Sequence, residues 1–221
     1  AYKETDLWIG IDKESFQITI PEFTESRIRA LRDIMDAYLA NDPEYATTLV
    51  SYEAKPEAPA IFLEMSEVAR QSGIGPMSAV AGAVAGYIAR EIKEKYGVQE
   101  IIVENGGDIY ADIRKDMDIA VFAGTSPLSE KVGFTIPAGY APLGICTSSG
   151  TVGPSLSFGK ADAVMIICKD CALADTYATA FANEIKTTDD IAPCIEKIGK
   201  ADDILAAICI KDDKIGIHGI F

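Results

Sequence analysis

Two runs of small residues constrain the fold most, because a helix made of them can pack only where a neighbour comes very close. The first run, Cys171 to Asn183, predicts a helix. At about 100° per residue, Asp175, Thr179 and Asn183 fall on one face. A carboxylate and a hydroxyl one turn apart can share a hard cation or bind a sugar phosphate. The alternative is that Asp175 is a cap or first-turn acid and Thr179 faces a strand.

The second run of small residues extends from Gly73 to Tyr87 and predicts a helix that continues to about Lys95. Ser78, Gly82 and Gly86 recur every four residues and line one edge. Since glycine inside a helix costs about 1 kcal/mol relative to alanine, this stripe indicates a close neighbour or a ligand, and packing on a sheet is the commoner reason. The turn before the helix resembles a phosphate-binding loop, but its third glycine is replaced by Ser78.

The other patterns predict α+β architecture in one domain, residues 1–221. Alternating residues predict a hairpin of strands 7–11 and 16–20, and apolar spacing predicts helices over about 21–42 and 61–71. The proline-containing segment 43–60 between these helices is expected to be a loop, with room for one short strand or helix. The Asn-Gly-Gly-Asp turn between 101–103 and 109–113 is typical of a hairpin. Further strands are expected at 118–123, 131–136, 142–146 and 162–168, with a closing hairpin of 204–210 and 215–221.

Composition excludes one class of partner. The 221 residues are 48% hydrophobic, which suffices for a sizeable core, and their net charge is −14. The negative electrostatic field of such a chain repels the phosphate backbone of nucleic acid, so nucleic acid is not an expected partner. A small phosphate ligand is still compatible with it, provided that a divalent cation or a helix N-terminus supplies local positive potential.

The five cysteines indicate a cytoplasmic protein with reduced, buried thiols. Cys168 and Cys171 have the spacing of a redox or zinc pair, but no second pair exists and the single histidine, His218, is distant in sequence. No apolar run is long enough to cross a bilayer, so no membrane association is expected. The first six residues do not have the pattern of a signal peptide, and the question whether a leader segment was removed stays open.

Three segments are expected to converge on a site: the turn 105–108, the loop 147–154, and the N-terminal turn of the helix 172–186. Each lies at the end of a strand, where backbone amides can hold anions. A serine hydrolase is a poor interpretation of the loop, because no nucleophile-elbow pattern surrounds its serines and His218 lies three residues from the chain terminus. A plain surface turn is the alternative for this loop.

Three ordered motifs resemble those of the ApbE family of FAD-binding, magnesium-dependent FMN transferases, once assigned to thiamine biosynthesis. They are 144–150 (Gly-Ile-Cys-Thr-Ser-Ser-Gly), the turn 105–108, and Ala174-Asp175-x-x-Ala-Thr179. A fourth, the small-residue helix near Tyr87, falls where the family places a similar helix. The resemblance spans residues 73–186. It implies a T-fold-related arrangement of antiparallel sheets with helices packed on one side.

The resemblance also implies roles for individual residues. Asp175 and Thr179 match metal ligands of the family, which would hold Mg²⁺ together with a carbonyl of the glycine-rich helix and the pyrophosphate of the ligand. The turn residues match positions near the nucleotide, the hydroxyl-rich loop matches the flavin site, and Asp108 and Ser148 are the candidates for orienting an acceptor hydroxyl. The residues expected at the FAD or FMN cofactor are Gly82, Gly86, Asn105, Gly106, Gly107, Asp108, Thr147, Ser148 and Gly150.

The chain also departs from the family pattern. Family transferases carry a His-x-x-Asp-Pro segment after the loop, whereas residues 155–161 contain no histidine and no Asp-Pro. Ala85 replaces the lysine expected before Gly86, and the chain is shorter than typical transferases.

Three functional hypotheses follow. The first is a protein that binds a flavin or another nucleotide through a divalent cation, with possible FMN transferase activity. The second is a non-catalytic flavin carrier or interaction protein, whose apolar strand 215–221 could support a homo-oligomer. The third, which rests on fold analogy alone, is a pterin or purine enzyme.

Overall fold

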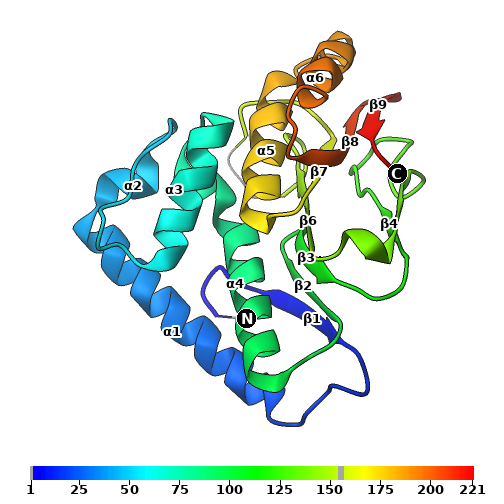
Figure 1. Cartoon of the computed structure of the whole chain (residues 1–221). Helices are drawn as coiled ribbons and strands as arrows, with labels where there is room; N and C mark the ends of the chain where they lie inside the picture. Colours follow the sequence, from blue (N-terminus) through cyan, green and yellow to red (C-terminus); the bar gives the residue numbers. More distant parts are fainter. Residues whose placement is uncertain (1, 154–156) are drawn as a thin grey trace.

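The fold consists of one large antiparallel sheet, helices on one of its faces and a small second sheet (Figure 1). The computed structural model describes residues 2–153 and 157–221. Its helices are α1 (Ile20–Asn41), α2 (Pro43–Thr47), α3 (Ala60–Ser72), α4 (Val80–Tyr96), α5 (Cys171–Glu184) and α6 (Ile191–Ile198), with short 3-10 turns η1 (Pro76–Ala79), η2 (Ala138–Tyr140) and η3 (Thr188–Asp190). Its strands are β1 (Leu7–Ile11), β2 (Ile101–Asn105), β3 (Asp108–Asp112), β4 (Met117–Ala120), β5 (Gly133–Ile136), β6 (Leu143–Ser148), β7 (Ala163–Cys168), β8 (Ile204–Lys211) and β9 (Lys214–Gly219).

The large sheet has the order β1-β2-β3-β6-β7-β8-β9, and every neighbouring pair is antiparallel. Helix α4 packs on β2 and β3, α5 packs on β6 and β7, and α6 packs on β8 and β9. The strands β4 and β5 form the separate two-stranded sheet. The predicted α+β class, with antiparallel sheets and helices on one side, is therefore confirmed.

The central strands are covered on both faces, which explains why they lack an alternating pattern. All six residues of β7 are buried. Ile166 and Cys168 point into the core under the helices, whereas Met165 and Ile167 belong to a second core beside Val121 and the β4–β5 sheet. Successive side chains of a strand point to opposite faces, so a strand between two cores must be apolar throughout.

The predicted hairpin of strands 7–11 and 16–20 is wrong. β1 pairs instead with β2, with Ile9 opposite Val103, and residues 16–19 form no strand. The carboxylate of Asp12 accepts the N–H groups of Ser15 and Glu100, at 2.9 and 2.8 Å, which turns the chain and ties it to the start of β2. α1 then begins at Ile20, because Pro21 has the backbone angle of a first helical turn.

Most other predicted elements are confirmed, with ends shifted by a few residues. These are the helices at 21–42 and 61–71, the hairpin of β2 and β3, the pair β4 and β5, the strands β6 and β7, the helix α5 and the closing hairpin of β8 and β9. The predicted loop at 43–60 contains the short helix α2. Residue 154, the last of the loop 147–154, lies outside the described residues.

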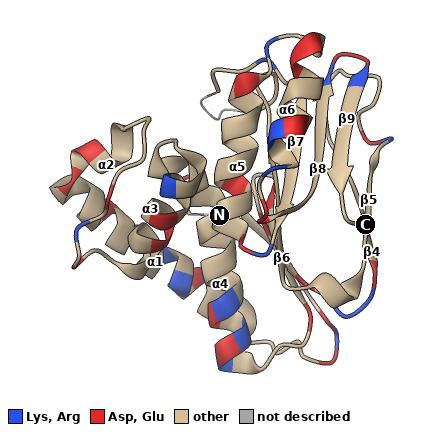
Figure 2. Ribbon diagram, turned by 45° about the horizontal axis from the view of Figure 1, so that its top comes forward, with Lys and Arg blue, Asp and Glu red and all other residues tan. Residues whose placement is uncertain are grey.

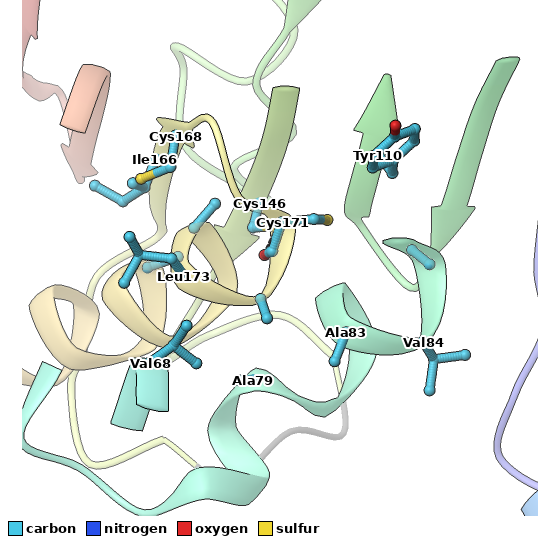
Figure 3. Packing of buried hydrophobic residues seen from close by; sticks show 14 of the residues in the cluster. Val68, Ala79, Ala83, Val84, Tyr110, Cys146, Ile166, Cys168, Cys171 and Leu173 are labelled. Carbon is cyan, nitrogen blue, oxygen red and sulfur yellow. Dashed lines mark hydrogen bonds between the residues drawn. The ribbon is translucent and has the colours of Figure 1, made fainter. Parts of the chain in front are cut away.

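The glycine stripe of α4 does allow a close approach, but its neighbour is helix α5 rather than the sheet. A Cβ on Gly82 would lie 2.4 Å from the carbonyl oxygen of Cys171 and 2.8 Å from Cβ of Asp175. On the other side of α5, a Cβ on Gly144 of β6 would lie 2.3 Å from Cα of Cys171. Figure 3 shows side chains of this layer, among them Ala83 and Cys171. Glycine on both sides thus lets the start of α5 sit between α4 and β6.

The turn before the stripe has a structural role. Gly73 ends α3 with φ at +76°, a left-handed conformation that favours glycine. A Cβ on Gly75 would lie 2.0 Å from the carbonyl oxygen of Thr48. The resemblance of this segment to a phosphate-binding loop therefore reflects a helix cap and a close backbone contact.

Charged residues lie mainly on the outer turns of helices and in loops (Figure 2), whereas β6 and β7 have none. Across residues 2–153 and 157–221, every helix is too short or too polar to traverse a bilayer.

Candidate functional site

A cavity of about 320 Å³ lies where the three predicted segments meet. Most of its wall is formed by the turn between β2 and β3, the end of β6 with its following loop, and Asp175 and Thr179 of α5, and β4 closes the remaining side. The lining residues are Glu104, Gly106, Gly107, Asp108, Ile109, Ile119, Ala120, Phe122, Thr147, Ser148, Ser149, Val152, Gly153, Asp175 and Thr179.

Asp175 links helix α5 to the N-terminus of α4. Its Oδ2 accepts the N–H of Gly82 at 2.8 Å, and the N–H of Ala81 also donates to the carboxylate. These amides belong to the first turn of α4, where backbone donors lack partners within the helix. Asp175 therefore caps the neighbouring helix, while Asp170 caps α5 itself by accepting the N–H of Leu173 at 2.8 Å.

Asp108 is held at the cavity floor by the turn that precedes it. Gly106 and Gly107 have φ of +66° and +102°, which an L side chain rarely adopts, so the tight Gly-Gly turn places Asp108 at the start of β3. Its carboxylate accepts the N–H of Thr147 and the thiol of Cys146.

The two buried carboxylates disfavour each other's ionisation. Burial raises the pKa of Asp108 to about 7, against the lowering effect of its two donors. Burial, and then the charge of Asp108, raise the pKa of Asp175 well above its usual range. Two acids near each other in a dry site cannot both ionise without a compensating positive charge.

Hydroxyl groups line the cavity beside these acids. Thr179 lies one turn after Asp175, is half-buried, and has no hydrogen-bond partner for its hydroxyl among the described residues. Ser148 at the end of β6 is likewise half-buried and without a side-chain partner in the described structure. By contrast, Ser149 uses its hydroxyl to order the loop, accepting the N–H groups of Thr151 and Val152 at 3.0 Å each.

Several predicted residues lie outside the cavity wall. Gly86 faces its own helix and α5, since a Cβ there would lie 3.1 Å from Nη1 of Arg90 and 3.7 Å from Cβ of Cys171. Asn105 is buried and donates to the carbonyl of Ala81 at 3.1 Å, which positions the start of α4. Gly82 donates its N–H to the carboxylate of Asp175, as described above, and is not a lining residue of the cavity.

Two further residues from the predicted set have packing roles. Gly150 donates its N–H to the carbonyl of Ala161 at 2.8 Å and lies against the backbone of Gly159. Asn183, which shares the predicted helix face with Thr179, accepts the N–H of Phe158 at 2.8 Å. Of the three residues on that face of α5, Asp175 and Thr179 therefore line the cavity and Asn183 does not.

The cysteines are buried and none forms a disulfide among the described residues, as predicted. Cys171 contacts Cys146 within the hydrophobic core, with the two sulfur atoms 3.8 Å apart (Figure 3). Burial raises the pKa of the Cys146 thiol well above its ordinary value. Cys146, Cys168 and Cys171 all have raised pKa values and act as packing groups. The spacing of Cys168 and Cys171 reflects the turn from β7 into α5.

Comparison with known proteins places the chain in a family. The sequence model of a family described as "AbpE bacteria" matches residues 1–204. The chain belongs to this family. Among its relatives, the UPF0280 protein of Methanocella arvoryzae is 36% identical over 192 residues, which cover 87% of this chain and 78% of the relative. The UPF0280 protein of Methanococcus aeolicus is 38% identical over 198 residues, covering 88% and 78% respectively.

A solved structure extends the comparison to the fold. The apo form of the Pseudomonas stutzeri flavinyl transferase ApbE superposes with a TM-score of 0.55 at 14% identity, covering 97% of this chain and 93% of that one. This likeness supports the fold alone. Together with the family match, it confirms the predicted relationship to ApbE proteins.

The cavity also contains residues that the sequence did not indicate. Glu104 precedes the predicted turn by one residue, so its place beside the turn could have been inferred. Ile119 and Phe122 come from β4 and the segment after it. Because β4 belongs to the separate small sheet, its position over the cavity depends on packing between distant parts of the chain, and no local pattern reveals it.

The ionisable side chains that line the cavity are all acidic. They are Glu104, Asp108 and Asp175, and no lysine, arginine or histidine lines the cavity among the described residues. Nor does any group of three His, Cys, Asp or Glu side chains within residues 2–153 and 157–221 form a complete metal site. A cation held here would need ligands from elsewhere, such as hydroxyls, water or a bound phosphate.

A second cavity, of about 620 Å³, lies between β1 and α1. It shares no lining residue with the first, and its walls are mainly apolar, with Ile9, Ile20 and Ile28 among them. Although larger, it contains no pair of acids and only Glu25 as a charged lining residue. We therefore take the smaller cavity as the functional site.

Proposed function

We propose that this protein binds a flavin nucleotide through a divalent cation held by Asp175 and Thr179, within a single ApbE-like domain over residues 1–221. The observation that supports this proposal most strongly is the acidic cavity itself. The lining contains three acidic residues and, among the described residues, no lysine, arginine or histidine, so a cation would let the buried acids ionise and would offset their repulsion of a phosphate group. The family relationship makes a flavin nucleotide the best candidate for the phosphate-bearing ligand.

The residues present fit Mg²⁺ on chemical grounds. Mg²⁺ prefers oxygen ligands, keeps several waters, and is commonly held by one or two carboxylates plus phosphate oxygens of a substrate. Asp175 and Thr179 offer a carboxylate and an unpartnered hydroxyl one helical turn apart. The incomplete protein ligand set agrees with a cation that binds together with the phosphate.

If the protein transfers FMN, Asp108 is the proposed base and Ser148 the proposed orienting hydroxyl. The acceptor oxygen would bond to the phosphorus of the FMN half of FAD, the bond from that phosphorus to the bridging oxygen would break, and AMP would leave. The acceptor proton would pass to Asp108, whose pKa of about 7 suits proton transfer at neutral pH. The cation, when bound, would neutralise charge on the pyrophosphate.

A matched set of variants tests the cation site. D175N and T179V should each weaken Mg²⁺-dependent FAD binding by at least tenfold, measured by equilibrium dialysis. D170N is the control, because it removes a carboxylate from the same helix while asparagine preserves the α5 cap. Equal FAD affinity in D175N and D170N would contradict the assignment.

Binding without transfer is the second candidate function. It is favoured by the sequence, in which residues 155–161 lack the family's His-x-x-Asp-Pro segment. Chromatographic detection of AMP released from FAD separates the two candidates: AMP release that needs an acceptor hydroxyl supports the transferase, and stable bound FAD supports the carrier.

A further inference from the structure

Phe122 is an exposed aromatic side chain at the wall of the acidic cavity. It is 57% exposed, although its neighbours Val121 and Ala123 are fully buried. Single exposed apolar side chains are common on proteins, and what distinguishes Phe122 is that it lies in the wall of the acidic cavity, where a bound ligand can cover it. The proposed cation site gives no role to Phe122, because the phenylalanine side chain has no oxygen atom that could bind a cation.

The backbone around Phe122 fixes the direction of its side chain. The N–H of Val121 donates to the carbonyl of Val132 at 2.9 Å, and the carbonyl of Val121 accepts the N–H of Glu130 at 2.8 Å. Val121 and Ala123 both anchor in the second core, and successive side chains in an extended segment point to opposite sides. Burial of Val121 and Ala123 on either side therefore directs the side chain of Phe122 outward.

The cavity is divided into two chemically different parts. Asp108, Asp175 and Thr179 supply the oxygen atoms of one part. The apolar part is formed by Ile109, Ile119, Phe122 and Val152, which come from β3, β4, the segment after β4, and the loop after β6. A ligand that satisfies both parts has a charged group that binds a cation and an apolar group that covers the hydrophobic wall.

We propose that Phe122 stacks on the isoalloxazine ring of the flavin nucleotide and selects flavin over other nucleotides; this inference rests on the proposed function. Aromatic rings bind flat heterocycles by offset stacking, which adds to the gain from covering apolar surface. The cation-bridged phosphate then fixes one end of the ligand, and the ring on Phe122 fixes the other.

Affinity measurements with FAD and ADP, both with Mg²⁺, test the inference. F122A should raise the Kd for FAD by roughly 5- to 100-fold, the range expected for loss of one stacked aromatic contact. The Kd for ADP should change less than twofold. F158A is the control, because Phe158 is similarly exposed, at 54%, and does not line the cavity; it should leave both values unchanged.

A spectroscopic variant tests contact directly. In F122W the indole should give a long-wavelength charge-transfer absorbance with bound FAD, and in F158W it should give none. Unchanged FAD affinity in F122A, or an equal loss of ADP affinity, would overturn the stacking inference while the cation site stands. Failure of the native protein to bind FAD with Mg²⁺ would instead overturn the proposed function.

Discussion

The buried acids of the cavity should make the ligand-free protein less stable as the pH rises towards neutrality. Asp108 has a pKa of about 7 in the folded protein, against an ordinary value of 3.8. The folded state therefore holds this proton more tightly than the unfolded chain does. Its contribution to stability is complete below pH 3.8 and is lost as the pH rises through about 7.

The magnitude follows from the gap between the two pKa values. At about 1.4 kcal/mol per pH unit, this gap corresponds to about 4 kcal/mol of unfolding free energy. Asp108 is buried, so solvent screening reduces this value little. Asp175 shifts in the same direction and adds to the effect. Replacing Asp108 with Asn removes one of the two titrating groups and should make the dependence between pH 4 and pH 8 shallower.

Urea unfolding at several pH values measures this effect in the native protein, D108N and D202N. Asp202 is exposed, so D202N reports the effect of removing one surface charge from an acidic chain. D108N should gain several kcal/mol over the native protein at pH 8 and nothing at pH 4. Adding Mg²⁺ at about 100 times its Kd should recover about 2.7 kcal/mol in the native protein at pH 8. Parallel curves for D108N and the native protein would refute the reasoning.

Three further predictions follow from the packing around α5. In urea unfolding, G82A should lower the unfolding free energy by about 1 to 3 kcal/mol, because the added methyl group overlaps the carbonyl of Cys171. G139A is the control: because the space around Gly139 is open, this substitution should change the unfolding free energy by less than about 0.5 kcal/mol. T179V should weaken Mg²⁺ binding without lowering the melting temperature, because the hydroxyl has no partner among the described residues, and a clear drop on calorimetry would contradict this. The five buried thiols should not react with a disulfide reagent until denaturant is added, so fast labelling of the native protein would contradict their burial.

Local patterns predicted the parts of the fold that depend on neighbouring residues. Helix α5 follows from its run of small residues, although its cap is Asp170 and not Asp175, and the hairpin of β2 and β3 follows from the Asn-Gly-Gly-Asp turn. The pairing of β1 could not be predicted in this way. Its partner, Ile101–Asn105, lies about 90 residues further along, and the alternating pattern of residues 16–20 resembles a nearer partner.

The candidate site likewise has one part that local sequence patterns predicted and another part that depends on tertiary packing. Asp108, Thr147, Ser148, Asp175 and Thr179 were expected together and do line one cavity. Two features of the site depend on tertiary packing and were not predicted. Asp175 caps helix α4 rather than its own helix, and Phe122 reaches the cavity from the segment that follows β4. The glycine stripe was correctly interpreted as a close approach, but the sequence did not identify α5 as the neighbour.

The central claim is that a flavin nucleotide enters this acidic cavity only with a divalent cation. Isothermal titration of the native protein with FAD, in Mg²⁺ and again in EDTA, tests it most directly. We predict a single binding event in Mg²⁺ and a loss of at least 100-fold in affinity in EDTA. Equal affinity in both buffers, or no binding in either, would contradict the claim.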